Sequence, residues 1–208
     1  MRLFLLRHGN TFEDGEPSRQ VGALTDVPLT TKGRAQARSA AAWLKAHDAV
    51  PTTVYCGRLK RQKETAEILS EALGAPVVET DALLELAHGA WENLTIEELK
   101  TRFPDSYRAW SEAGEWPAEF EGSFEEARRR ISDFLDMTLA AHGDGETVAA
   151  VTSQGAMKVA ASLVAAERWE ELKASRGIGE FKVKTGAFCE LSHMDGAWKL
   201  VAWNVVPE

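Results

Sequence analysis

The stretch that decides the fold is residues 3–11, which read LFLLRHGNT. The apolar run 3–6 predicts a short strand, and it stops abruptly at Arg7 and His8. Gly9 has no Cβ, so the backbone there can turn sharply and come close to a ligand. An imidazole and a guanidinium at a strand end suit phosphate chemistry, one as a nucleophile and the other as an anion clamp. The tripeptide Arg7-His8-Gly9 alone also fits a polar turn after an edge strand. Its functional interpretation therefore depends on the rest of the chain.

Outward from this stretch, predicted strands and helices alternate along the chain, which implies parallel strand pairing. We therefore predict an α/β fold, a three-layer α/β/α sandwich with helices on both faces of a mostly parallel sheet. The further predicted strands are 52–56, 76–80, 147–153, 187–191 and 198–203, the last two around a turn at 194–196. The predicted helices are 31–47, 58–73 (closed by Gly74) and 157–166.

The middle of the chain is less regular. Thr95 and Ser123 each precede a glutamate by three residues, a spacing typical of a capping box, and Ser123 opens a long helix. Residues 91–122 hold three tryptophans, and we predict an irregular or helical insertion there, more a packed helical subdomain than a substrate-contacting lid. The chain has no internal repeat and no linker, so residues 1–208 are predicted to form a single domain.

Composition restricts the class of protein and its partners. The chain has 208 residues, of which 44% are hydrophobic and 27% charged, as in an ordinary globular domain with a real core. Its net charge of −8 argues against nucleic acid and membranes as partners, because both reward basic patches. The arginines at 128–130 are interpreted as a solvated helix face. No signal peptide or membrane-spanning stretch is recognisable, so a cytoplasmic location is expected.

The cysteines and histidines suggest no metal site. Cys56 and Cys189 form neither a disulfide pattern nor a zinc motif, so reduced thiols are expected. Phosphate-binding glycine loops of the Walker and dinucleotide types are absent, which argues against kinase or dehydrogenase chemistry. The remaining histidines lack metal-ligand spacing and are expected in loops or at the surface, although His88 lies close to Glu85 in sequence. These histidines are His47, His88, His142 and His193.

Four candidate side chains follow four predicted strands. His8 follows the first strand, and Arg61, Glu85 and Gln154 each follow a later one. In an open parallel sheet, ligands bind beyond the carboxyl ends of the strands, so these side chains should meet at one rim. Arg61 also opens a helix, and a helix N-terminus favours an anion.

Three further blocks support this interpretation. Residues 25–30 read TDVPLT before a helix, residues 59–61 read LKR at the start of the next, and residues 83–92 read LLELAHGAWE. In this order and spacing, from residue 1 to about residue 204, the chain resembles the histidine phosphatase superfamily. The resemblance implies a phosphoglycerate mutase-like fold.

The resemblance also implies roles for the candidates. His8 would attack phosphorus and become phosphohistidine. Arg7 and Arg61 would hold the phosphoryl oxygens. Glu85, placed four residues before Gly89 as in the family pattern, would protonate the leaving alkoxide and later activate water. Neither a metal nor a cofactor is implied.

The sequence departs from the family at Gln154, because the strand before it usually ends in Ser-His-Gly and here reads Ser-Gln-Gly. An amide can donate a hydrogen bond but carries no charge. Loss of a hydrogen bond to a charged group is worth roughly 1.5–3 kcal/mol, or about ten- to over a hundredfold in rate.

Two smaller departures concern the loops. Residues 121–123 read EGS where the family commonly has Gly-Glu-Ser, and no clear counterpart exists for a phosphate-binding asparagine after His8. Glu13 or Asp14 could occupy the space of that asparagine, but a negatively charged side chain would not replace it in binding phosphate. Asn10 and Thr11 are candidates for neutral hydrogen bonds to the phosphoryl group, although capping their own turn suits them as well.

The preferred hypothesis is a metal-independent phosphomonoesterase that acts on a small phosphorylated metabolite through phospho-His8. The alternative from another class is a phosphate-binding or regulatory protein with little or no turnover, which Gln154 favours. A phosphoglycerate-type mutase is less favoured, since mutases retain a bisphosphorylated cofactor and usually have longer chains. The sequence names neither the substrate nor the oligomeric state, and it leaves open whether Gln154 is natural, adaptive or introduced.

Overall fold

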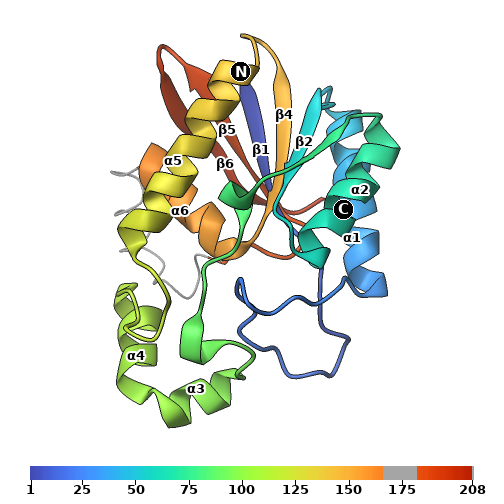
Figure 1. The fold of residues 1–208 in the computed structure, drawn as a ribbon. Helices are drawn as coiled ribbons and strands as arrows, with labels where there is room; N and C mark the ends of the chain where they lie inside the picture. Colours follow the sequence, from blue (N-terminus) through green and yellow to red (C-terminus); the bar gives the residue numbers. More distant parts are fainter. Residues whose placement is uncertain (166–181, 208) are drawn as a thin grey trace.

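The structure, a computed structural model, describes residues 1–165 and 182–207. Within these residues one sheet has the strand order β3-β2-β4-β1-β5-β6 (Figure 1). Neighbours among the first four strands in this order are parallel, whereas β5 is antiparallel to β1 and β6. The mostly parallel sheet is therefore confirmed. The strands are β1 (Arg2–Arg7), β2 (Thr53–Cys56), β3 (Val77–Glu79), β4 (Thr147–Thr152), β5 (Phe188–Met194) and β6 (Ala197–Val205).

The central strand β1 shows why its sequence decides the fold. Side chains alternate between the two faces of a strand. Leu3 and Leu5 belong to one core cluster, whereas Phe4 and Leu6 belong to another on the opposite face. All four are buried, as expected for a strand in a sheet that is covered on both faces.

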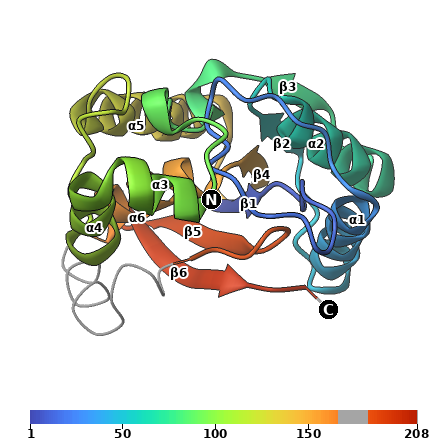
Figure 2. The same ribbon diagram turned by 90° about the horizontal axis from the view of Figure 1, so that it is seen from below.

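Helices cover both faces of the sheet (Figure 1, Figure 2). On one face α1 (Thr31–Ala46) packs beside α2 (Lys60–Leu73), and their alanine and leucine side chains meet Phe4 and Leu6. On the other face lie α5 (Phe124–Ala141) and α6 (Gln154–Val164), with Ile131, Phe134 and Met157 in the core. This is the predicted three-layer α/β/α sandwich.

Two short helices lie beyond the carboxyl ends of the parallel strands, α3 (Ile96–Arg102) and α4 (Pro104–Ala113) (Figure 1). Trp91, in the 3-10 turn η2 (Gly89–Trp91), is fully buried in a cluster with Leu99 and Phe120. A second 3-10 turn, η1 (Asp81–Leu83), follows β3. Both predicted capping boxes are confirmed, at Thr95 before α3 and at Ser123 before α5.

Several predicted boundaries are wrong. The helix predicted at 157–166 begins at Gln154, because Gly155 reads as a turn signal in sequence but is tolerated in the first helical turn. Its predicted end, residue 166, lies outside the described residues. The last strand runs two residues beyond the predicted 198–203 at its far end. Among the described helices, none is long and apolar enough to cross a membrane.

Candidate active site

His8 stands at the carboxyl end of β1 and is buried, with 5% of its surface exposed. Its Nδ1 lies 2.8 Å from the carbonyl oxygen of Gly9, so Nδ1 is assigned the proton and donates it there. The unprotonated Nε2 then accepts a hydrogen bond from Nε of Arg61 at 3.2 Å. Burial, together with the charges of Arg61 and Arg7, holds the pKa of His8 well below its usual range. The imidazole is therefore neutral at pH 7, and its lone pair on Nε2 accepts the hydrogen bond from Arg61.

Arg61 lies in the first turn of α2, and none of its surface is exposed. Its terminal nitrogens donate to backbone carbonyls of the loop before α1, at Thr25 (2.8 Å) and Gly22 (3.0 Å). The prediction that Arg61 lines the cavity is wrong in detail, because Arg61 contacts Nε2 of His8 but is not among the cavity-lining residues. Because its side chain is fully buried, Arg61 is not an exposed charge on the surface of α2.

Arg7 and Gln154 lie side by side at the ends of β1 and β4. One terminal nitrogen of Arg7 donates to Oε1 of Gln154 at 3.2 Å and to the carbonyl of Val183. The same Gln154 oxygen accepts from the backbone N–H of Val183. Nε of Arg7 is buried and has no hydrogen-bond partner among the described residues. A buried, unpartnered cationic donor beside His8 is a position where an anion would be stabilised.

Glu85 follows η1 and is buried, with 6% of its surface exposed. One carboxylate oxygen accepts from the backbone N–H of Gly155 at 3.1 Å, and the other from that of Leu86. A Cβ at Gly155 would lie only 2.3 Å from Glu85, so glycine is required for this close approach. The start of α6 therefore fixes the position of the carboxyl group.

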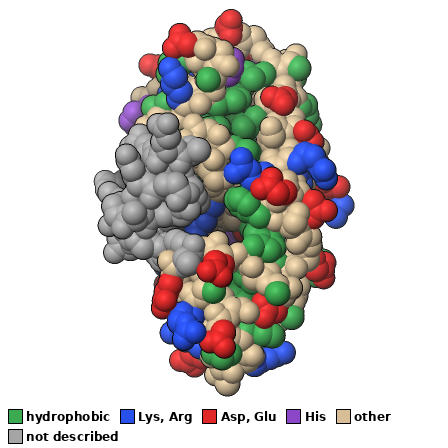
Figure 3. Space-filling model, turned by 90° about the vertical axis from the view of Figure 1, so that its left-hand side faces the viewer, with side chains coloured by type: hydrophobic (Ala, Val, Ile, Leu, Met, Phe, Trp, Pro, Cys, Tyr) green, Lys and Arg blue, Asp and Glu red, His purple; other side chains and the backbone are tan. Residues whose placement is uncertain are grey.

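A cavity of about 730 Å³ opens at this edge of the sheet. Arg7, His8, Glu85 and Gln154 line it, so the predicted convergence of strand ends is confirmed for these side chains. Part of its lining is apolar and aromatic. The side of the molecule drawn in Figure 3 has a hollow with hydrophobic, basic and acidic side chains around it. The aromatic lining residues include Trp110, Trp116, Phe120 and Phe124.

The aromatic wall comes from the segment predicted as an insertion. Trp91 supports the interpretation of residues 91–122 as a packed helical unit, because its side chain is fully buried within it. Trp110 and Trp116 lie at the edge of that cluster and also face the cavity. The segment thus has a core of its own and a surface that lines the cavity.

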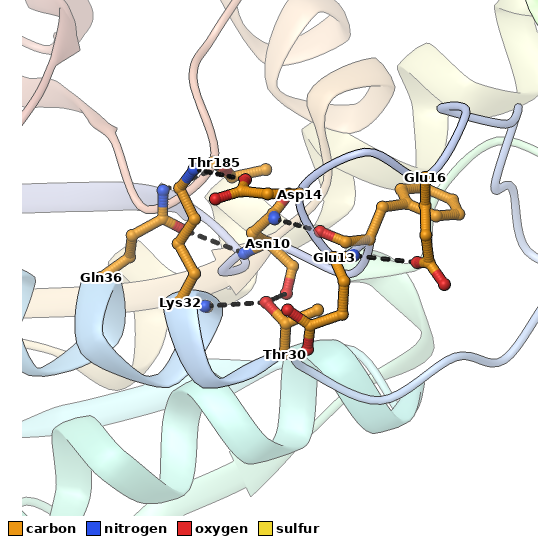
Figure 4. Close-up of polar contacts among 10 residues, drawn as sticks. Asn10, Glu13, Asp14, Glu16, Thr30, Lys32, Gln36 and Thr185 are labelled. Carbon is orange, nitrogen blue, oxygen red and sulfur yellow. Dashed lines mark hydrogen bonds and ion pairs between the residues drawn. The ribbon is translucent and has the colours of Figure 1, made fainter.

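The loop after His8 holds no acidic group near Nε2. Asn10 and Thr11 line the cavity, and the Asn10 amide donates to the carbonyl of Phe12, which is the turn-capping role considered for it. Asp14 instead pairs with Lys32 at 2.9 Å, with 85% of its side chain exposed, and Glu13 is exposed nearby (Figure 4). The expectation that either carboxylate occupies the space beside the phosphoryl site is wrong.

His88 lies in a loop, as expected, but it is not a surface residue. It is buried, lines the cavity and packs against the ring of Phe120 at 4.7 Å. Burial lowers the pKa of His88, and its Nδ1 has no hydrogen-bond partner among the described residues. His47 is exposed as expected, whereas His142 is half-buried and bonds Tyr55 and Glu146.

Sequence reasoning missed three contributors to the site. Glu92 accepts from the backbone of Gly22 and Leu24 and from the Thr25 hydroxyl, and so orders the loop whose carbonyls hold Arg61. The motif in residues 83–92 contained Glu92, but its partners are distant in sequence. The other two are Lys158 and Arg128, which line the cavity. The run 128–130 is therefore not simply a solvated face, and Arg130 donates to the carbonyl of Leu84.

Metal ligands do not gather at this site. Within residues 1–165 and 182–207, no group of three or more His, Cys, Asp or Glu side chains is arranged to hold an ion. Cys56 and Cys189 are buried and unpaired, and burial raises the pKa of each thiol to about 12. Both thiols are therefore protonated at neutral pH.

The combination of a buried strand-end histidine, two arginines and a carboxyl group can be compared with known proteins. The profile described as histidine phosphatase superfamily (branch 1) matches residues 3–206. The chain belongs to the histidine phosphatase superfamily. Its fold and its phosphoglycerate mutase-like relatives agree with the resemblance stated from sequence.

Relatives within this superfamily are named as phosphatases and mutases. The chain is 29% identical over 98% of its length to adenosylcobalamin/alpha-ribazole phosphatase of Salmonella typhimurium, covering 96% of that protein. It is 29% identical to phosphoserine phosphatase 1 of Hydrogenobacter thermophilus, over 73% of this chain and 70% of that one. A 2,3-bisphosphoglycerate-dependent phosphoglycerate mutase of Corynebacterium diphtheriae is 36% identical, but the match spans 60% of this chain and only 51% of the mutase.

Solved structures of the superfamily superpose on the whole chain. A mycobacterial glucosyl-3-phosphoglycerate phosphatase, Rv2419c, solved with VO3, has a TM-score of 0.83 and 26% identity, with 98% of each chain covered. Bacillus stearothermophilus YhfR has a TM-score of 0.82 and 25% identity, over 99% of this chain and 97% of that one. Within the histidine phosphatase superfamily this chain is therefore similar to several phosphatases over its full length.

Proposed function

We propose that this protein is a metal-independent phosphomonoesterase that transfers the phosphoryl group of a small metabolite to His8 and then to water. The observation that carries the proposal is the neutral, buried imidazole of His8, whose Nε2 lone pair lies beside two arginines and within the same cavity as Glu85. The named phosphatases among the relatives support the same reaction class.

In the first step, Nε2 of His8 attacks phosphorus and the bond from phosphorus to the ester oxygen breaks. The Nε–H of Arg61 turns from Nε2 to a phosphoryl oxygen, and the unpartnered Nε of Arg7 binds another. A protonated Glu85 gives its proton to the departing alkoxide, which leaves as an alcohol. The products of this step are phospho-His8 and a Glu85 carboxylate.

In the second step, the Glu85 carboxylate takes a proton from a water molecule as its oxygen attacks phosphorus. The bond from phosphorus to Nε2 breaks, so inorganic phosphate leaves and His8 regains its lone pair. Gln154 stabilises the transferring group through its neutral amide only. That amide does not donate to another described residue, whereas its oxygen already holds Arg7.

The test is hydrolysis of a panel of phosphomonoesters by the wild type and by His8→Ala. We expect release of inorganic phosphate by the wild type, unaffected by EDTA, and a loss of at least about a thousandfold in kcat in His8→Ala, because covalent catalysis is removed. His47→Ala is the matched control, since His47 is exposed at the end of α1. Undiminished turnover in His8→Ala, or inactivation by EDTA that magnesium reverses, would refute the proposal.

Gln154 favours a second candidate, a phosphate-binding or regulatory protein with little turnover. A neutral donor stabilises a bound dianion in the ground state but adds less than a cation to the transition state. This candidate predicts calorimetrically detectable binding of inorganic phosphate that Arg7→Met abolishes, with no hydrolysis of any ester. Measurable turnover that depends on His8 would exclude it.

A further inference from the structure

Among the described residues, the lining of the cavity is cationic although the protein as a whole is acidic. Six Lys or Arg side chains line it, against a single carboxylate among the described lining residues, Glu85. The chain carries a net charge of −8, so this concentration of positive charge is local. One phosphoryl group bound beside His8 and Arg7 would neutralise only part of this positive charge.

One face of α6 forms a wall of this cavity for two helical turns. Its lining residues are Gln154, Gly155, Lys158, Val159 and Ser162, which is the spacing of a single helix face. Lys158 lies one turn after Gln154, which places it about 6 Å further along the helix axis. It is therefore displaced from the phosphoryl site toward the part of the cavity that receives the alcohol portion of an ester.

Lys158 is a half-buried cation on α6. No carboxylate among the described residues forms an ion pair with it. Burial, with smaller contributions from the charges of Arg7 and Lys182, lowers the pKa of Lys158 to about 8, and the charge of Glu85 opposes this shift. Arg128 lies on α5, over the ring of Phe124, and lines the same cavity. A desolvated ammonium group in this position is stabilised when an anion binds beside it.

We propose that Lys158 selects substrates that carry a second anionic group, a carboxylate or another phosphate, a few bonds from the phosphoryl group. The inference rests on the proposed phosphatase function and adds the substrate class. Arg7 and His8 hold the phosphoryl end, Lys158 holds the second anion, and the aromatic wall covers the carbon chain between them. A phosphomonoester without a second charge leaves Lys158 unpaired in the complex.

The test compares three esters of similar size. Glycerol 3-phosphate has no second anion, 3-phosphoglycerate has a carboxylate in the same position, and glycerol 1,3-bisphosphate has a second phosphate. For the wild type we expect kcat/KM about tenfold or more higher for at least one of the two anionic esters than for glycerol 3-phosphate, mainly through KM. A charge-assisted hydrogen bond is roughly of this strength. Which ester is preferred identifies the second anion.

Lys158→Met should remove this preference by raising KM about tenfold for the preferred ester. Its kcat and KM for glycerol 3-phosphate should change less than about twofold. Lys158→Arg keeps the charge and should retain most of the preference. Lys45→Met, on the exposed end of α1, is the control. The inference is overturned if the wild type shows no preference, if Lys158→Met retains it, or if all three esters lose activity equally.

Failure of the proposed function gives a different result. If the wild type hydrolyses none of the esters, or His8→Ala hydrolyses them as well as the wild type, phosphohistidine chemistry is refuted. The inference is then decided by calorimetric binding of the same esters to the wild type and Lys158→Met. Loss of the preference for an anionic ester in Lys158→Met supports the role of Lys158, and an unchanged preference overturns it.

Discussion

At the scale of the residue, the chemistry depends on which protons the buried groups hold. Burial and two neighbouring arginines keep His8 neutral, and the carbonyl of Gly9 takes the Nδ1 proton, so the lone pair is on Nε2. On the surface, solvent would stabilise the charged form of the histidine, and its pKa would not be lowered by burial. The same burial leaves Arg7 with an Nε that has no hydrogen-bond partner in the part of the chain that the structure describes.

Substitution of Gln154 tests how strongly its neutral amide limits turnover. Its oxygen accepts from Arg7 and from the backbone of Val183, whereas its amide nitrogen donates to none of the described residues and can meet a phosphoryl group. Gln154→His should raise kcat on a good phosphomonoester roughly tenfold, because a cationic donor stabilises the transferring group more than a neutral one. KM should rise modestly, since Arg7 loses an acceptor.

Steady-state kinetics of the wild type, Gln154→His and Gln154→Met measure this effect. Gln154→Met has neither donor nor acceptor and should lower kcat/KM, which separates loss of the amide from gain of the charge. An unchanged or lower kcat in Gln154→His would mean that the missing histidine is no handicap in this protein.

At the scale of the element, the first turn of α6 positions the proposed general acid. Glu85 comes from the segment after β3, yet one of its oxygens is held by the N–H of Gly155 at the start of α6. Glu92 has a comparable effect on the opposite side, where it orders the loop that holds Arg61. The site is thus assembled from loops that meet only in the folded chain.

Gly155→Ala tests the positioning of Glu85. The new Cβ would meet Glu85 at 2.3 Å, so the flexible carboxylate must move away while the fold persists. We expect kcat for alkyl phosphates, whose leaving groups need a proton, to fall about a hundredfold, within the range of general acid catalysis. For 4-nitrophenyl phosphate, which has a good leaving group, the loss should be under about fivefold.

The control for this variant is Gly143→Ala, where the nearest atom to a new Cβ is at an ordinary 3.4 Å. Thermal unfolding of both variants should match that of the wild type. Equal losses of kcat on both classes of ester would show that Gly155 does not act through the leaving-group proton.

The sequence predicted most elements because their signals are local. The apolar run in β1, the capping boxes before α3 and α5, and the glycine after α2 each depend on a few neighbouring residues. The start of α6 was missed because Gly155 serves a tertiary contact that sequence spacing does not reveal. The sequence motifs identified Arg61, but its complete burial against His8 is also a tertiary contact and was not predicted.

At the scale of the whole molecule, a sheet buried on both faces provides one edge where polar groups from distant segments meet. The fold explains why His8, Glu85 and Gln154 converge, since each follows a strand of the same parallel sheet. It does not dictate the charges that line the cavity. The cations come from β1, the loop before α1, α5, α6 and the chain before β5, and the net charge of −8 gave no indication of them.

The central claim is that His8 carries the phosphoryl group during turnover, and rapid-quench mass spectrometry tests it most directly. The wild type, mixed with a phosphomonoester and quenched under alkaline conditions, should gain the mass of one phosphoryl group on the peptide that contains His8. The label should be lost on acidification, as expected for a phosphorus–nitrogen bond, and should be absent in His8→Ala. Hydrolysis without any phosphorylated peptide, or a label on another residue that persists in His8→Ala, would contradict the account.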